Sequence, residues 1–481
     1  MSEPSLPALS GMALEELAEL LSPLPRFRAA QIFKWIASGA SAFDEMLNLP
    51  LPLRQSLSLR CRPRPQAAVT RLSAADGTVK LAAQFADGAR IEAVLLAYSS
   101  PQEPAQAPAA QGAEMRGAAA CGAGAWQRGE GSAVGNGASM RGAAVCGAGA
   151  GRRGEGRAVG NGAVMRSAAA RGADGQRGAR LTACLSTQVG CPAGCVFCKT
   201  GSMGFLRNLT SAEIVEQFLL LAAEAACRGA ISRGQPPEEP APEWPAPEGP
   251  APEGPAPEGQ AESAARQTQA HEGQAKGAAQ GRPISNIVVM GMGEPLLNLE
   301  QLRKALAVIS DSRGLNFSRR RITISTCGIA EGIADLADNG PAARLALSLT
   351  TADEGLRRRL MPFTAARPLS EVKEALRRFQ ARGGGRITLE ATLLGGINTR
   401  AQDAKAMAKF AEGLDAAVNL IPWNPVKGLE FEGAPLREPP AAEVEAFSRS
   451  LAALGLSATR RFRRGRGVMG ACGQLGGTAL P

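Results

Sequence analysis

Three cysteines, Cys191, Cys195 and Cys198, follow the spacing C-x3-C-x2-C in the segment GCPAGCVFCKTG. Three thiolates this close can hold three irons of a [4Fe–4S] cluster and leave the fourth iron without a protein ligand. An iron with an open position can chelate the amino and carboxylate groups of S-adenosylmethionine. The alternative is a structural zinc with Cys184 as the fourth ligand. Such zinc sites usually pair two CxxC-like motifs far apart in sequence, and no second motif exists here, so the spacing favours the cluster.

The composition narrows the chemistry further. The chain has 481 residues, of which 44% are hydrophobic, which is ample for a large enzyme core with accessory parts. His271 is the single histidine, so no His-ligated metal site, Ser-His-Asp triad or histidine general base can be built. Proton transfer must then fall to Glu, Asp, Lys, Tyr or Cys.

The charge balance is basic, with 54 Lys+Arg against 44 Asp+Glu and a formal net charge of +10. Nucleic acid is the polyanionic partner that fits best, because arginines cluster at Arg319–Arg321, at Arg357–Arg359 and between Arg460 and Arg466. No signal peptide and no long apolar run are visible, and several of the ten cysteines lie at motif spacings. We therefore expect a cytoplasmic protein with reduced thiols and no membrane span.

The chain divides into segments of different composition. Residues 1–66 predict a helical accessory domain, and residues 67–98 predict a β-hairpin that links it to the rest. Residues 99–178 hold a Gly/Ala-rich repeat, and residues 229–282 are rich in Pro, Glu and Gly. Both predict disordered insertions, because neither could bury much apolar surface. The remaining residues, 179–481 without the second insertion, predict the catalytic domain.

Two details of the N-terminal part can be tested against a structure. The segment RFRAAQIFKWI predicts a helix with Phe27, Ile32, Phe33 and Ile36 on one side. Asp87-Gly88 predicts the turn of the hairpin, which carries Glu92 in its second strand.

Strand-like and helix-like segments alternate through the catalytic domain. This order predicts an α/β fold with a partial parallel (β/α) barrel. Strands are expected over 179–186, 284–290, 321–325, 344–350, 386–394 and 417–421, and helices over 211–226, 299–310, 370–382 and 400–412. The cysteine segment follows the first strand, at the end of the barrel where such folds carry their chemistry.

Further polar motifs come at the ends of successive strands. In the segment GMGEPLLN, Gly293 allows a close backbone approach and Glu294 can accept hydrogen bonds from an ammonium group. The amide of Asn398 can read an adenine edge through paired hydrogen bonds. Residues at the other strand ends are Ser325, Ser348, Leu349 and Thr350. Each motif alone is weakly specific, and their recurrence at one end of the barrel is the strong signal.

With these motifs the sequence closely resembles the radical S-adenosylmethionine methyltransferases that modify carbon 2 of adenine in ribosomal and transfer RNA. The resemblance covers nearly the whole chain outside the insertions, and its most specific segments are CLSTQVGCPAGCVFC, GMGEP and ACGQL. It implies two substrates, 23S rRNA at the peptidyl transferase centre and tRNA at the adenine next to the anticodon. It also implies a [4Fe–4S] cluster, two S-adenosylmethionine molecules per turnover, an electron donor such as flavodoxin, and a monomer.

The resemblance implies a role for each site residue. Cys472 would first take a methyl group and then carry its carbon to the base, Glu92 would accept the ring proton, and Cys184 would free Cys472 through a transient disulfide. Cys191, Cys195 and Cys198 would bind the cluster. The S-adenosylmethionine site would be lined by Gly293, Glu294, Ser325, Ser348, Leu349, Thr350 and Asn398. Thr350 departs from the family, in which histidine usually follows Ser-Leu, and only a backbone contact would survive that change.

Three alternatives remain open at this point. The first is the sister activity, methylation of carbon 8 of the same adenine in 23S rRNA. The second is a catalytically silent RNA-binding module, against which the intact cysteines, GMGEP and ACGQL argue. The third is a radical enzyme that acts on protein or small molecules, which the basic helical N-terminal region and the arginine clusters disfavour.

Overall fold

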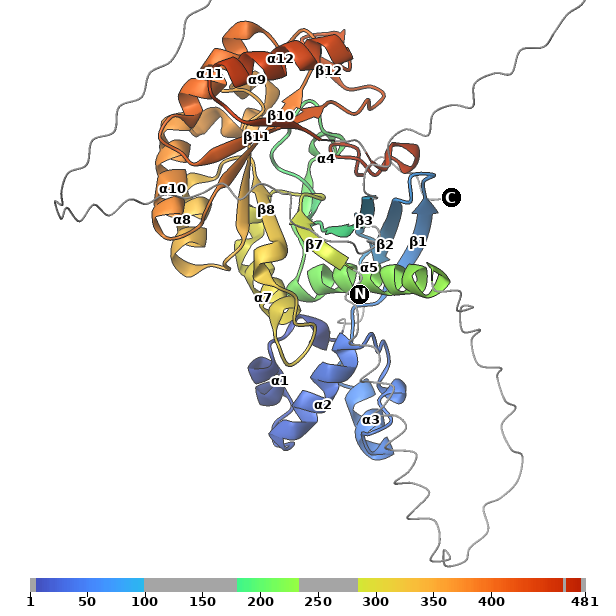
Figure 1. Ribbon diagram of the computed structural model, residues 1–481. Coiled ribbons are helices and arrows are strands. Elements are labelled where there is room, and N and C mark those ends of the chain that lie inside the picture. The colour runs from blue at the N-terminus through green and yellow to red at the C-terminus, as the bar shows by residue number, and fades with distance from the viewer. Residues whose placement is uncertain (1–5, 99–179, 233–283, 462–463, 477–481) are drawn as a thin grey trace, which may run out of the picture. The chain divides into compact units, whose positions relative to one another are not determined.

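The structure is a computed structural model, and it describes residues 6–98, 180–232, 284–461 and 464–476. Its centre is a ten-stranded sheet, whose first four strands are antiparallel neighbours in space (Figure 1). These strands are β1 (Ala67–Ser73), β2 (Val79–Phe85), β3 (Arg90–Tyr98) and β4 (Arg180–Cys184). The predicted hairpin therefore exists as β2 and β3, and it joins the main sheet through the pairing of β3 with β4.

From β4 onward every pair of neighbouring strands in this sheet is parallel. The strands follow in the order β7 (Ile284–Val289), β8 (Ile322–Thr326), β9 (Arg344–Ser348), β10 (Ile387–Leu393), β11 (Ala416–Pro422) and β14 (Ala458–Arg460). The six strands predicted for the barrel are present as β4 and β7–β11, within a few residues of their expected ends, whereas β14 was not predicted. The α/β fold with a partial parallel barrel is thus confirmed, and β1 and β14 form the two edges of the sheet.

Helices connect the parallel strands and cover the outer side of the curved sheet (Figure 1). The four predicted helices are present as α5 (Ser211–Ser232), α7 (Leu299–Ser310), α10 (Leu369–Ala381) and α11 (Ala401–Ala411). The described residues also form α4 (Lys199–Ser202), α8 (Ala330–Asn339), α9 (Glu354–Leu360) and α12 (Ala441–Ala453), for which the sequence analysis gave no ranges. In the described part of the chain, no helix has both the length and the apolar character needed to cross a bilayer.

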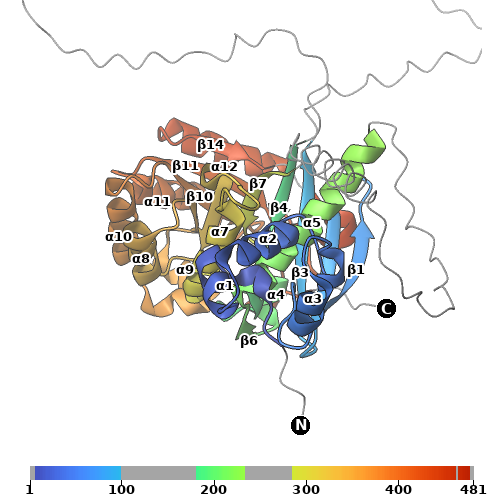
Figure 2. The same cartoon turned by 90° about the horizontal axis from the view of Figure 1, so that it is seen from below.

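The N-terminal region contains α1 (Leu14–Leu20), α2 (Arg26–Ala37) and α3 (Leu51–Ser58), which lie together in Figure 2. Ile32, Phe33 and Ile36 are buried as predicted, but Phe27 is 54% exposed, so its placement on the apolar face was wrong. Phe27 instead lies beneath the guanidinium of Arg28, whose carbon is 4.8 Å from the ring centroid. A paired contact ties this region to the helix α5, because the Arg64 guanidinium donates to both carboxylate oxygens of Glu216, each at 2.7 Å.

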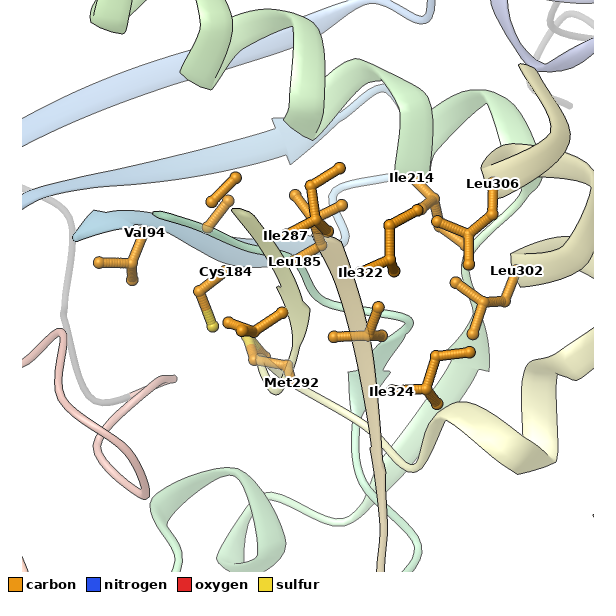
Figure 3. Packing of buried hydrophobic residues seen from close by; sticks show 14 of the residues in the cluster. Val94, Cys184, Leu185, Ile214, Ile287, Met292, Leu302, Leu306, Ile322 and Ile324 are labelled. Atoms are coloured by element: carbon orange, nitrogen blue, oxygen red, sulfur yellow. The ribbon is translucent and has the colours of Figure 1, made fainter. Parts of the chain in front are cut away.

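The core lies between the sheet and its helices. Figure 3 shows the part nearest the site, where Cys184 lies among buried side chains that include Val94, Leu185 and Met292. The parallel strands β7, β8 and β10 are buried along most of their length, because the helices cover the outer face of the sheet. Side chains at the carboxyl ends of the parallel strands consequently meet on the inner side of the barrel.

The arginine clusters are only partly at the surface. Arg319, Arg320 and Arg358 are exposed, as the charge argument requires, whereas Arg357 is 2% exposed. Arg357 donates hydrogen bonds to the carbonyl oxygens of Leu349 and Cys327. The sequence alone misplaced Arg357 on a basic surface, because its neighbours on α9 are exposed. The repeat and most of the second insertion, together with His271, lie outside the described residues.

Candidate active site

A pocket opens at the carboxyl ends of the parallel strands and gathers most of the predicted site residues. Residues from the cysteine segment, from the ends of β7, β8 and β9 and from the C-terminal segment share its wall. The predicted residues that line it are Cys191, Cys195, Cys198, Gly293, Glu294, Ser325, Ser348, Thr350 and Cys472. The predicted residues that do not line it are Leu349, Asn398, Glu92 and Cys184.

The cysteine segment is held by a short hairpin of β5 (Gln188–Gly190) and β6 (Phe205–Asn208). The Cys191 N–H donates to the Gly204 carbonyl oxygen at 2.7 Å. Gly190 has a φ of +73°, and a Cβ at this position would lie 2.0 Å from the same oxygen. Only glycine can therefore adopt this backbone conformation and this close approach directly before Cys191. The Val196 N–H donates to the Leu360 carbonyl oxygen at 3.0 Å, which fixes the middle of the segment to α9.

The three thiols line one pocket, as the shared ligands of one cluster would. In the described part of the chain, no three His, Cys, Asp or Glu side chains converge on one metal-ion position. Cys195 nevertheless lies close enough to Cys191 and Cys198 for a charge on either to raise its pKa, although burial raises it more. Burial also raises the pKa of Cys191 to about 12, so these thiols need bound metal to remain deprotonated. The zinc alternative loses its fourth ligand, because Cys184 does not line the pocket.

Glu294 is a buried carboxylate in the lining of the pocket. Its carboxylate accepts hydrogen bonds from the backbone N–H groups of Cys327 at 2.7 Å and Leu296 at 3.1 Å. Burial raises its pKa, and these hydrogen bonds oppose the shift. Gly293, with a φ of +103°, brings the backbone against Gln188, where a Cβ would lie 2.6 Å from the Gln188 Cβ. A buried carboxylate beside three thiols can bind an ammonium group.

Ser325 and Ser348 come from adjacent strands and their hydroxyl oxygens are 3.1 Å apart. Thr350 follows with a φ of +60°, an unusual conformation for a β-branched residue. Its N–H donates to the Glu390 carbonyl oxygen at 2.9 Å, and its own carbonyl oxygen accepts from the Asn398 amide at 3.0 Å. The backbone of Thr350 is thus fixed by its neighbours on both sides, independently of its side chain.

Asn398 does not face the pocket. Its amide oxygen accepts from the Leu394 N–H at 2.8 Å, and its amide nitrogen donates to the carbonyl oxygens of Thr350 and Thr392. Both amide hydrogens are therefore used by the backbone, and the sequence-based expectation that they read an adenine edge is not supported by this geometry. Asn398 instead holds the turn that carries Thr350.

Asn424, which the sequence analysis overlooked, lines the pocket. Its amide nitrogen donates to the Cys472 carbonyl oxygen at 3.0 Å, which fixes the orientation of the amide. Its amide oxygen is buried and has no hydrogen-bond partner among the described residues. A buried acceptor without a donor is costly, so this oxygen fits a ligand that donates a hydrogen bond. The signal in the sequence was the segment LIPWNP, in which Asn424 comes two residues after the end of β11.

The segment that carries Cys472 packs against the cysteine segment. The Lys199 N–H donates to the Gly473 carbonyl oxygen at 2.8 Å. The Thr200 hydroxyl donates to the Leu475 carbonyl oxygen at 2.7 Å. Lys199 and Thr200 begin α4 (Lys199–Ser202), directly after Cys198. Cys472 is exposed to the pocket, yet the surrounding wall raises its pKa through burial. The structure thus brings together two segments that are more than 250 residues apart in sequence.

Cys184 and Glu92 lie behind this pocket, on the sheet. Val94 pairs directly with both Lys80 and Cys184, so these side chains share one face of the sheet, and Glu92, two residues before Val94, lies on the same face. Burial and, to a smaller extent, the nearby thiol of Cys472 raise the pKa of Cys184 to about 12. All described cysteines are free thiols.

Glu92 is 5% exposed and its carboxylate is held on two sides. One oxygen lies 3.2 Å from the Lys80 ammonium, and the other accepts the Gly476 N–H at 2.9 Å. Its backbone carbonyl accepts from the Ser186 hydroxyl at 2.6 Å. Gly476 lies four residues after Cys472, so Glu92 is hydrogen-bonded directly to the segment that carries this cysteine.

Glu390 and Arg461 are two further charged groups that sequence analysis missed. Glu390 lies on β10 opposite Ser348, is 7% exposed and lines the pocket. The Arg461 guanidinium lies 3.2 Å from its carboxylate. The signal for Glu390 was a lone acid within the apolar strand ITLEATL, whereas the contacts of Arg461 could not be predicted from an arginine-rich segment.

Comparisons with known proteins show the class to which the chain belongs. A family model of the radical SAM superfamily matches residues 264–411, and one of the ribosomal RNA large subunit methyltransferase N-terminal domain matches residues 8–62. The crystal structure of a radical SAM methyltransferase from Sphaerobacter thermophilus superposes with a TM-score of 0.66 at 28% identity, over 98% of this chain and 100% of that one. The fold, the three-cysteine segment and these matches define a radical SAM RNA methyltransferase, a class that implies a [4Fe–4S] cluster and S-adenosylmethionine.

Curated relatives narrow the class to one family. The chain is 34% identical over 472 residues to a "Probable dual-specificity RNA methyltransferase RlmN" of Treponema pallidum (strain Nichols), covering 98% of each protein. It is 32% identical over 467 residues to a protein of the same name from Thermus thermophilus, covering 96% of this chain and 93% of the relative. The chain belongs to the RlmN family of RNA methyltransferases.

Proposed function

We propose that this RNA methyltransferase transfers a methyl group to carbon 2 of adenine, in 23S rRNA at the peptidyl transferase centre and in tRNA next to the anticodon. The observation that supports it most is the placement of Cys472 in the wall of the pocket that Cys191, Cys195 and Cys198 share. The naming of the relatives as dual-specificity enzymes favours two RNA substrates. We further propose that the protein is a cytoplasmic monomer that takes electrons from a donor such as flavodoxin.

Within this proposal the pocket holds both cofactors. Cys191, Cys195 and Cys198 would ligate the cluster, and Glu294 would bind the ammonium group of S-adenosylmethionine. Ser325, Ser348 and the backbone of Thr350 would line the remainder, and Asn424 would accept a hydrogen bond from the bound molecule in place of Asn398. When bound, the cluster and two S-adenosylmethionine molecules per turnover supply one methyl group and one carbon-centred radical reaction.

The chain's own residues would then carry the methyl carbon. Carbon 2 of adenine is not nucleophilic, so a carrier is needed, and the Cys472 thiolate is the nucleophile available in the pocket. The methylated sulfur would hold the carbon next to the base until the new carbon–carbon bond forms. This leaves Cys472 joined to RNA through a methylene group.

Release of the RNA requires a base and a second thiol. Glu92 would take the proton from carbon 2, and the Gly476 N–H that it accepts places it against the segment of Cys472. The Cys184 thiolate would attack the Cys472 sulfur, forming a sulfur–sulfur bond as the bond between sulfur and methylene carbon breaks. The electron pair of the broken bond stays with the RNA, which picks up a proton as its methyl group is completed.

Nucleoside mass spectrometry tests this function. Ribosomal RNA and tRNA from the host, with and without the gene, would be digested and compared with standards of 2-methyladenosine and 8-methyladenosine. Loss of 2-methyladenosine from both RNAs in the deletion strain is expected. Loss of 8-methyladenosine instead would establish the sister activity, and unchanged RNA would favour the silent RNA-binding module.

A further inference from the structure

Arg357 carries a buried guanidinium directly behind the wall of the active site. It lies on α9 and is 2% exposed. The guanidinium donates hydrogen bonds to the carbonyl oxygens of Leu349 and Cys327, and to that of Ser348 at 3.2 Å. One of its nitrogens also lies 3.5 Å from the sulfur of Met361. Because Cys327, Ser348 and Met361 all line the pocket, the guanidinium lies one layer of residues behind the pocket surface.

The helix that carries Arg357 is packed against the cysteine segment. The Leu360 carbonyl oxygen accepts the Val196 N–H at 3.0 Å. Arg357 and Leu360 are three residues apart on α9 and both are buried, so they lie on the same side of the helix. Val196 directly follows Cys195, which places the guanidinium on the side of the pocket that holds this cysteine. Burial raises the pKa of Cys195 and the charge of Arg357 opposes that shift, in agreement with this placement.

The charge of Arg357 is not balanced by an acid. Within the described part of the chain it forms no ion pair, and its Nε atom has no hydrogen-bond partner. Glu294 and Glu354, which lie on neighbouring segments, accept the backbone N–H groups of Cys327 and Leu369 instead. A guanidinium stays protonated in proteins, and a buried charge without a counter-charge is costly. The carbonyl oxygens around it carry no net charge, so the pocket is the place where a balancing anion can bind.

A [4Fe–4S] cluster held by Cys191, Cys195 and Cys198 would be such an anion. The three thiolates outweigh the positive charge of the oxidised iron–sulfur core, and reduction adds one further negative charge. A fixed cation near one of the ligands stabilises both forms and favours the reduced form more. Net charge is one of the factors that set the reduction potential of such clusters, so the position of Arg357 bears directly on that potential.

We propose that Arg357 is a positioning residue for the cluster, which supplies its positive counter-charge and raises its reduction potential. The cluster takes up one electron from an external flavoprotein donor, and no bond forms or breaks at Arg357. The inference rests on the cluster that the class implies, and it is independent of the RNA substrate and of the carbon that is methylated. A protein that methylates carbon 8 would show the same effect, so this inference and the proposed function can fail separately.

The test is the midpoint potential of the reconstituted cluster. Full-length protein and its variants would be loaded with iron and sulfide in the absence of oxygen and of S-adenosylmethionine, and the iron content of each would be measured. Each protein would then be titrated with dithionite in the presence of redox mediators. The electron paramagnetic resonance signal of the reduced cluster reports the fraction reduced at each potential.

The variants separate the charge of Arg357 from its hydrogen bonds. Arg357→Gln and Arg357→Met remove the charge, and each should lower the equilibrium constant for reduction by about tenfold or more, the usual effect of one nearby charge. For a one-electron couple, this is a fall of about 59 mV in the midpoint potential. Arg357→Lys keeps the charge, so its potential should stay near that of the wild type. Arg358 is the next residue on α9 and is exposed, so Arg358→Gln should leave the potential unchanged because water screens its charge.

An unchanged potential in a folded, cluster-loaded neutral variant would overturn the inference, and so would an equal fall in Arg357→Lys. Folded neutral variants that hold no iron, while Arg357→Lys holds it, would support the inference, because the anionic cluster would then need the cation to bind. Loss of iron from Arg357→Lys as well would show that the hydrogen bonds decide, and would contradict it. If neither neutral variant folds, Arg357→Lys decides alone: a potential near that of the wild type supports the inference, and a fall of about tenfold in the reduction equilibrium contradicts it.

Discussion

The buried ion pair between Lys80 and Glu92 makes a quantitative prediction for the variant Lys80→Met. Lys80 is 0% exposed and Glu92 is 5% exposed, and the charged atoms are 3.2 Å apart. At this distance and an effective dielectric constant near 20, their attraction is about 5 kcal/mol. Removing the ammonium leaves a buried carboxylate that still accepts the Gly476 N–H but has lost its opposite charge. The free energy of unfolding should fall by about 3–5 kcal/mol, the usual cost of breaking such a pair.

Equilibrium urea unfolding of the full chain, followed by tryptophan fluorescence, measures this loss. The matched control is the double variant Lys80→Met/Glu92→Gln, in which no charge remains unpaired and the glutamine oxygen can still accept the Gly476 N–H. It should be more stable than Lys80→Met, and the four proteins of the cycle give the coupling energy directly. A loss below about 1 kcal/mol in Lys80→Met, the value of an exposed pair, would refute the reasoning. So would a double variant no more stable than the single one.

Three further predictions concern the site itself. Gly190→Ala should destabilise the protein and abolish cluster binding, because the added Cβ would lie 2.0 Å from a backbone oxygen. Cluster binding is measured as iron and sulfide content. The control is Gly88→Ala, where φ is +81° and the surrounding space is open; it should lower the free energy of unfolding by only about 1–2 kcal/mol and keep the cluster. Cys198→Ala should lose the visible absorbance of the reconstituted cluster and all RNA methylation, and retained activity would rule out the ligand assignment. Cys184→Ala should accumulate a covalent RNA–protein adduct, seen as an RNase-sensitive shift on a denaturing gel, whereas Cys472→Ala should give none; ordinary turnover by Cys184→Ala would remove the disulfide step.

The predictions from local pattern succeeded where one segment decides the outcome. The six barrel strands were predicted correctly because each is rich in β-branched or other apolar residues and most of its positions are buried beneath the covering helices. The helices α7, α10 and α11 were predicted correctly because each has a regular apolar stripe on the side that faces the sheet. The short helix α9 was missed because it spans only seven residues, too few for such a stripe to stand out.

Errors arose where a residue's environment comes from another part of the chain. Phe27 has the spacing of a core residue, but it stays exposed and a neighbouring arginine covers its ring instead. Arg357 sits in a basic run, yet its side chain is directed inward and backbone oxygens accept its hydrogen bonds. Asn398 and Asn424 both follow strands, and only the fold shows that the first bonds to the backbone while the second faces the pocket.

The sequence by itself determined the chemistry that is possible. The spacing of Cys191, Cys195 and Cys198 predicts a cluster, and the lack of any histidine outside the insertion leaves proton transfer to Glu, Asp, Lys, Tyr or Cys. Both conclusions depend on residue types alone. Tertiary structure decided which of these groups meet. Cys472 reaches the cysteine segment, and Glu92 reaches the segment of Cys472, because the strands of one curved sheet bring their ends to a common point. Contacts between residues hundreds of positions apart depend on that curvature and on strand order, which no local pattern encodes.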